Sequence, residues 1–154
     1  MAALHLLVRL VHVAGMAVLL GGAALVWGQC RLAPDGPDDE PLATDRARDE
    51  PLATAAAYEW LFWGAVGLVV LTGVGNLGAM APAVRGPGTG WGLTFAVKLA
   101  AVGGLLAGSL ARTLAVARWR ATAIRPGTRL GTAYAATAGY LVVLVALAEV
   151  LAHG

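Results

Sequence analysis

The segment LGTAYAATAGYLVVLVALAEVLA, residues 130–152, contains one charged side chain, that of Glu149. About 20 consecutive apolar residues are enough for a helix to cross the hydrocarbon core of a bilayer. A helix that is apolar on every side is typical of a buried or membrane-spanning position. This stretch therefore predicts a transmembrane helix.

Three further segments have the same character, at residues 4–28, 55–80 and 91–114. Hydrophobic residues make up 58% of the 154 residues and charged residues 13%, and the mean hydropathy is +0.72. A soluble domain carries roughly 25% charged residues, so a soluble globular enzyme is excluded. The sequence predicts an all-α integral membrane protein: one four-helix transmembrane bundle over residues 1–154, multi-pass in the cell membrane.

Two other properties narrow the class of protein. The net charge of +2 and the pI near 9.1 are too weak to indicate a nucleic-acid partner. The single cysteine, Cys30, cannot form a disulfide within the chain.

The first segment could instead be a signal peptide, but its apolar run exceeds the roughly 7–15 residues of such a peptide and no basic segment precedes it. We expect it to be a retained span.

The connections between the segments predict the orientation in the membrane. The first and third connections together hold eight arginines, against Arg85 alone in the second. The eight are Arg31, Arg46, Arg48, Arg112, Arg118, Arg120, Arg125 and Arg129. Because basic residues favour cytoplasmic loops, we expect these two connections in the cytoplasm and both termini outside.

The first connection is predicted as an acidic loop over residues 31–52. It repeats the hexapeptide Asp-Glu-Pro-Leu-Ala-Thr, at 39–44 and again at 49–54, and its seven acids outnumber its three arginines. One interpretation is that it docks on the basic third connection or recruits a protein partner. The other, which composition favours, is a solvated linker made by local duplication.

Polar side chains inside the spans predict a pocket in the outer half of the bundle. Ionisable groups at membrane depth are costly and usually face a site or a partner. Counted from the outer ends at 1.5 Å per residue, the deeper groups lie about 5–12 Å below the surface. The predicted pocket residues are His12, Lys98, Thr72, Asn76, Glu149 and Arg9. Glu59, in the second span, is a further intramembrane carboxylate.

Histidine and methionine near the outer ends make a metal site one possibility. His5, Arg9 and His12 are spaced i, i+4, i+7 and so share one stripe of a helix. Neutral imidazole ligates haem iron, copper or zinc, and thioether sulfur favours Cu(I). The predicted metal ligands are His12, His5, His153 and Met80, with copper or haem b as the cofactor. The alternative for His5 and Arg9 is that they only reach the interface.

Lys98 admits several interpretations. It could bind a haem propionate, hold an anionic substrate, or form a structural ion pair with Glu149. His12 has no second histidine at its own depth, so a haem at His12 would use Lys98 or a non-protein group as its other ligand. The sequence has no Cys-x-x-Cys-His motif, which excludes covalently attached haem.

Short motifs in three spans resemble the CopD-type copper-resistance membrane domain and its relatives, the HemJ-type protoporphyrinogen oxidases. They are Leu10-Val11-His12 followed by Leu20-Gly21-Gly22-Ala23, then Leu71-Thr72-Gly73, and then Trp91-Gly92 followed by Lys98-Leu99, with Arg112 further on. The resemblance covers nearly the whole chain. It implies copper uptake or tolerance on the CopD side. On the HemJ side it implies haem b and an oxidase activity linked to His12 and Lys98.

The chain departs from the HemJ pattern at Leu19-Leu20-Gly21-Gly22, and the later Pro-Arg and histidine are absent, which favours the CopD side. Three hypotheses follow. The first is a CopD-like protein that handles copper. The second is a haem-b redox protein or HemJ-like oxidase. The third is a non-catalytic accessory subunit with a structural polar cluster, whose acidic loop meets a partner. The expected partners are the lipid bilayer, a metal ion or haem, and either a second copy of the chain in a homo-oligomer or a protein at the acidic loop.

Overall fold

The computed structural model describes residues 2–32, 41–79, 88–122 and 128–153, and all four segments are helical. Helix α1 covers Ala2–Leu32, α2 Pro41–Ala79, α3 Gly90–Thr122 and α4 Thr128–His153. Each contains a stretch long and apolar enough to cross a membrane: Ala3–Leu32, Glu50–Asn76, Gly90–Thr122 and Thr128–Ala152. The predicted all-α bundle with four potential spans is confirmed.

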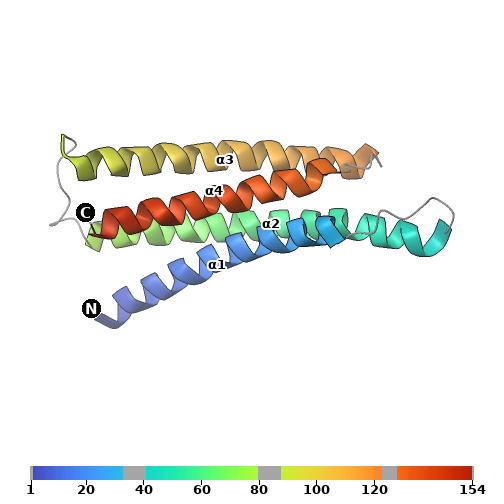
Figure 1. Cartoon of the computed structure of the whole chain (residues 1–154). Coiled ribbons are helices and arrows are strands. Elements are labelled where there is room, and N and C mark those ends of the chain that lie inside the picture. The colour runs from blue at the N-terminus through green and yellow to red at the C-terminus, as the bar shows by residue number, and fades with distance from the viewer. Residues whose placement is uncertain (1, 33–40, 80–87, 123–127, 154) are drawn as a thin grey trace.

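The helices run up and down in sequence order, so that the first turn of α1 and the last turn of α4 lie at the same end (Figure 1). Helix α1 packs against α2 and α4, and α3 packs against α4 and, over a smaller contact, α2. Helices α1 and α3 are therefore diagonal across the bundle. Alternating helices with short connections give this antiparallel arrangement.

The predicted acidic loop at 31–52 is wrong in its extent. Helix α1 continues to Leu32 and α2 begins at Pro41, so only residues 33–40 of that range are not in a described helix, and they lie outside the described residues. Proline is well placed at Pro41, because the first position of a helix has no backbone partner for an N–H. The alanine-rich sequence that follows favours helix, and α2 also continues through Pro51.

The buried core occupies one half of the bundle. At the end of the bundle that holds the start of α1, the outermost buried position among the described residues of each helix is as follows: Gly15 in α1, Thr72 in α2, Leu105 in α3 and Leu144 in α4. Beyond these positions, toward the end that holds the start of α1, every described side chain is exposed or half-buried. In Figure 1 the first half of α1 diverges from the other helices at this end. We call the residues between these four positions and that end of the bundle the open half, and the rest of the bundle the closed half.

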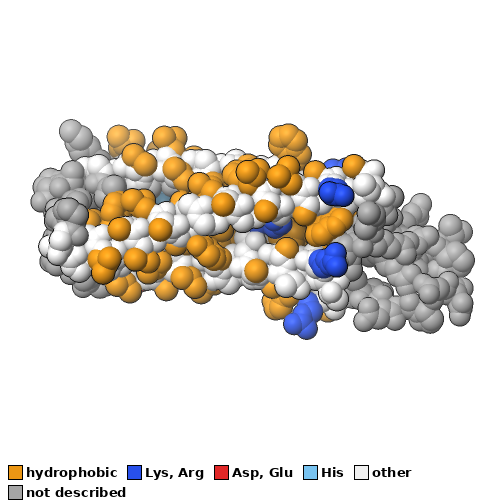
Figure 2. All heavy atoms as spheres, turned by 90° about the horizontal axis from the view of Figure 1, so that it is seen from above, with side chains coloured by type: hydrophobic (Ala, Val, Ile, Leu, Met, Phe, Trp, Pro, Cys, Tyr) orange, Lys and Arg blue, Asp and Glu red, His pale blue; other side chains and the backbone are white. Residues whose placement is uncertain are grey.

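The outer surface of the bundle is apolar. Exposed leucines and valines occur on all four helices, including Leu10, Leu71, Leu99 and Val142. Figure 2 shows hydrophobic side chains along the visible face and most of the basic ones gathered at one end. Contiguous exposed apolar area of this kind marks a surface that contacts lipid or protein rather than water.

Candidate site in the open half and a buried polar network

His12 lies at the inner edge of the open half and is held by α2. Its side chain is half-buried, and Nδ1 lies 3.0 Å from Oγ1 of Thr72. Thr72 is buried and comes from the predicted Leu-Thr-Gly segment. The helices that carry them, α1 and α2, pack against each other. The structure therefore brings together two of the six predicted pocket residues through a hydrogen bond.

The partners of Thr72 determine which nitrogen of His12 carries the proton. The Thr72 hydroxyl donates to the carbonyl of Leu68 at 2.7 Å, with the carbonyl of Val69 at 3.2 Å. A hydroxyl has one proton, so Thr72 Oγ1 acts toward His12 as an acceptor. Nδ1 is thus the donor, and in the neutral ring Nε2 keeps a free lone pair.

Lys98 reaches the same region from the diagonal helix α3. Its side chain is half-buried, and its positive charge is close enough to act on the His12 ring. Within the described part of the chain, no ion pair or hydrogen bond joins the Lys98 ammonium group to another side chain. The ion pair with Glu149, one of the three interpretations of Lys98, is not among the contacts that the structure describes. Glu149 is exposed.

Asn76 contributes a polar atom without a partner. It follows Thr72 by one helical turn, so both side chains lie on the same side of α2. Its Oδ1 is buried and has no hydrogen bond among the described residues. A buried amide oxygen without a partner is costly, and such a group usually faces a water, an ion or a ligand. Asn76 therefore adds an acceptor to the open half.

The other predicted site residues are less involved. The side chains of His5 and Arg9 are exposed, and no polar contact between described residues joins either of them to His12. Met80 and the side chain of His153 lie outside the described residues. No group of three or more His, Cys, Asp or Glu side chains with metal-binding geometry occurs in the part of the chain that the structure describes.

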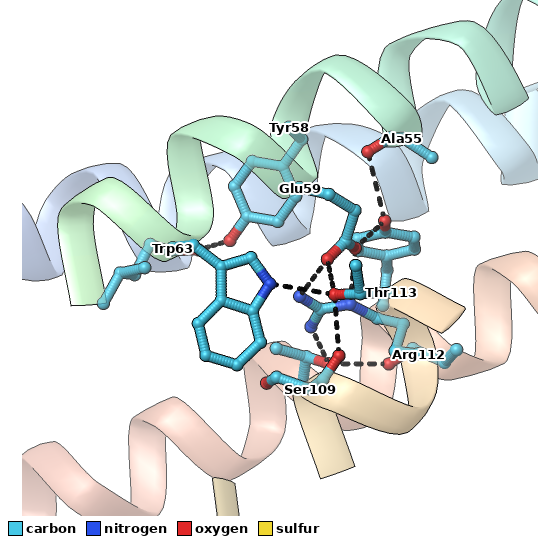
Figure 3. A network of polar contacts seen from close by, with 11 residues as sticks. Ala55, Tyr58, Glu59, Trp63, Ser109, Arg112 and Thr113 are labelled. Carbon is cyan, nitrogen blue, oxygen red and sulfur yellow. Dashed lines mark hydrogen bonds and ion pairs between the residues drawn. The ribbon is translucent and has the colours of Figure 1, made fainter. Parts of the chain in front are cut away.

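A second polar centre lies in the closed half, where Glu59 of α2 pairs with Arg112 of α3 (Figure 3). Arg112 Nε donates to Glu59 Oε1 at 2.8 Å and Nη2 to Oε2 at 3.2 Å, and both residues are about 95% buried. The Tyr134 hydroxyl donates to Oε1 at 2.5 Å, and the Thr113 hydroxyl contacts Oε2. The carboxylate therefore has partners on α3 and, through Tyr134, on α4.

The guanidinium group of Arg112 is surrounded by aromatic rings. Its Cζ lies 4.4 Å from the ring centre of Phe62, 4.9 Å from that of Tyr134 and 5.9 Å from that of Tyr58. Nη1 donates to Thr137 Oγ1 at 2.7 Å. Cation–π contacts and paired hydrogen bonds stabilise a buried charge that would otherwise be expensive. This network is internally satisfied at Glu59 and Arg112, which is typical of a structural element.

The network also reaches the first helix and an indole. Tyr58 donates to the carbonyl of Leu19 on α1 at 2.5 Å, and Trp63 Nε1 donates to Thr113 Oγ1 at 3.0 Å. Beside them, Ser109 Oγ is buried without a partner among the described residues. All four helices thus contribute to one polar centre, which lies about 20 Å along α2 from Thr72.

Sequence reasoning identified Glu59 as an intramembrane carboxylate, but it counted Arg112, near the end of the predicted 91–114 segment, among the arginines of the third connection. That count is wrong, because α3 continues through Arg112 to Thr122 and buries the guanidinium. The signal against it is the apolar sequence on both sides of Arg112, from Leu110 to Val116. A buried arginine in such a span requires a carboxylate, and Glu59 is the acid at middle depth.

No protein-family model, curated protein or solved structure matches this chain.

Proposed function

We propose that the chain is an integral membrane protein of the CopD type that binds a metal through Nε2 of His12 in the open half. The observation that carries this is the hydrogen bond from Nδ1 to Thr72 Oγ1. A metal-ligating histidine usually donates its other ring N–H to a fixed acceptor, which sets the tautomer and the ring orientation. His12 has that arrangement on the side of the bundle where the helices are least tightly packed.

Copper handling is the leading form of this proposal. Met16 follows His12 by one helical turn and is half-buried, so an imidazole and a thioether lie on adjacent positions of the same helix face. Soft thioether ligands select Cu(I). Met80 and the side chain of His153 lie outside the described residues, and they are proposed to complete the ligand set on the sequence alone. Copper is then the substrate or cargo of the protein.

Haem b is the second candidate, and the observation that favours it is Lys98. An ammonium group near His12 that has no carboxylate partner among the described residues suits a ligand that carries negative charge. His12 would supply the axial imidazole, and Lys98 would pair with a propionate. Bound haem would supply one-electron redox chemistry. The same charge opposes the binding of a bare cation, so Lys98 distinguishes the two candidates.

The proposed orientation does not depend on Arg112. Seven arginines remain in or beside the first and third connections, against Arg85 in the second. The described ones, Arg31, Arg118, Arg120 and Arg129, are exposed at helix ends. The positive-inside bias therefore supports a multi-pass protein of the cell membrane, with this end in the cytoplasm and the open half toward the outside.

The experiment is to purify the full chain from membranes and measure bound copper by elemental analysis and haem by its absorption near the Soret region. His12→Ala should abolish the bound metal, while His5→Ala, which changes an exposed histidine on the same helix, should retain it. Lys98→Met should tighten copper binding but weaken haem binding. A wild-type protein that takes up neither copper nor haem contradicts the proposal and supports the accessory-subunit hypothesis.

A further inference from the structure

Four arginines lie close to one end of the bundle, opposite the open half. Arg31 is in the last turn of α1, Arg118 and Arg120 are in the last turns of α3, and Arg129 is in the first turn of α4. All four side chains are exposed. Figure 2 shows basic side chains gathered toward this end, while hydrophobic side chains are spread along the rest of the visible face.

The ends of these helices are neighbours. A Cβ built on Gly131 of α4 would lie 3.1 Å from Cβ of Cys30 on α1, so the last turn of α1 contacts the first turn of α4. Helices α3 and α4 pack against each other, and their ends at Thr122 and Thr128 are close in sequence. The arginines of three helices therefore share one end surface.

Among the described residues, none of these arginines is paired with a carboxylate. The side chains of Arg118, Arg120 and Arg129 make no ion pair or hydrogen bond among the described residues, and Arg31 contacts only an aromatic ring, that of Trp27 at 5.6 Å. Trp119, between Arg118 and Arg120, packs against the core. Tryptophan beside arginine at a helix end is typical of the membrane–water interface.

We propose that this end surface binds the phosphate headgroups of anionic phospholipids. A guanidinium presents a planar set of donors that matches phosphate oxygens. Juxtamembrane basic residues are attracted to anionic lipid, and each arginine lost should reduce the binding about fivefold. Exposed apolar side chains on the same helices, Leu25 of α1 and Leu114 of α3, lie toward the middle of the bundle from the arginines and offer a surface for the acyl chains. This inference is independent of the metal proposed at His12.

The test uses the full chain purified in a neutral detergent and titrated with phosphatidylglycerol or phosphatidylcholine, with bound lipid counted by native mass spectrometry. We expect wild-type protein to prefer phosphatidylglycerol, and the preference to fall as salt rises. In the variant R118Q/R120Q the affinity for phosphatidylglycerol should fall roughly 25-fold. Both side chains are exposed, so the variant should keep its fold, which circular dichroism would check.

The matched control is Arg9→Gln. It removes an exposed arginine at the opposite end of the bundle, in the open half, and should leave the preference for phosphatidylglycerol unchanged. Equal binding of the two lipids by wild-type protein would overturn the proposal. So would an unchanged preference in R118Q/R120Q. Inorganic phosphate that displaces phosphatidylglycerol at equal concentration would also overturn it, because the surface would then take free phosphate rather than lipid.

Discussion

Arg112 of α3 and Glu59 of α2 form a paired, buried contact, with Nε 2.8 Å from Oε1 and Nη2 3.2 Å from Oε2. Two hydrogen bonds between a guanidinium and a carboxylate fix the rotation of one helix relative to the other. Tyr134 and Thr137 connect the same pair to α4. The contact therefore sets the register of three helices in the closed half.

Removing one partner of this pair should destabilise the protein strongly. Arg112→Met leaves the Glu59 carboxylate buried without its cation, and breaking a buried pair in this way costs about 3–5 kcal/mol. Thermal unfolding in detergent, followed by circular dichroism, measures the effect. The control is Arg118→Met, which changes an exposed arginine of the same helix and should have little effect. Equal losses in the two variants would contradict the structural role of the pair.

The hydroxyl of Tyr134 should matter more than that of Tyr140. Tyr134 is fully buried, and its hydroxyl donates to Glu59 Oε1 at 2.5 Å, with the carbonyl of Ala55 at 3.3 Å. Tyr134→Phe removes a hydrogen bond to a buried charge, at a cost of about 1.5–3 kcal/mol. Tyr140 is partly exposed, so Tyr140→Phe should change the unfolding temperature little. The opposite order would place the important hydroxyl outside the network.

Two adjacent glycines of α1 should respond differently to alanine. A Cβ on Gly22 would overlap the ring of Tyr58, which is buried and hydrogen-bonded to Leu19, whereas a Cβ on Gly21 would meet open space. Gly22→Ala should therefore destabilise the bundle by about 1–3 kcal/mol through overpacking. Gly21→Ala should be neutral or slightly stabilising, because alanine favours helix. Thermal unfolding of both variants decides this, and a tolerated Gly22→Ala would contradict the close packing of α1 on α2.

The number of helices and their apolar character could be predicted because composition and segment length determine both. The hydrogen bond between His12 and Thr72 was harder to predict. The sequence indicates that both residues lie in the outer half, but the contact depends on the relative rotation of α1 and α2. Lys98 and Glu149 illustrate the limit. Their depths allow an ion pair, but depth does not determine which way a side chain faces, and Glu149 is exposed.

Arg112 shows where a count of charges fails. A rule that assigns arginines to loops treats a buried arginine and a cytoplasmic one alike, because the rule does not include the partner. The apolar residues that follow Arg112 extend α3 to Thr122, and Glu59 compensates the charge. The helical start of α2 at Pro41 was missed for a related reason, since acidic and proline-containing sequence is usually assigned to loops.

The predicted orientation can be tested with single cysteines in a background without Cys30. A cysteine at Gly88, between α2 and α3, should react with a membrane-impermeant reagent added to intact cells. Cysteines at Thr44 and Thr128 should react only after the membrane is permeabilised, because the connections that carry most of the arginines are expected inside. Labelling at Thr44 and Thr128 but not at Gly88 would reverse the orientation and place the open half in the cytoplasm.

The final prediction concerns Thr72 and rests on the proposed metal site. Thr72→Val keeps the shape of the side chain but removes the acceptor for Nδ1 of His12, so the ring loses the contact that fixes its tautomer. Loss of such an outer partner typically weakens metal affinity about 10–100-fold. Copper and haem binding to Thr72→Val would be compared with Thr72→Ser, which retains the hydroxyl, and with Thr132→Val, an exposed threonine that bonds only within its own helix. Full affinity in Thr72→Val would mean that this hydrogen bond does not orient a metal ligand. Equal weakening in Thr132→Val would instead indicate a general effect on the bundle.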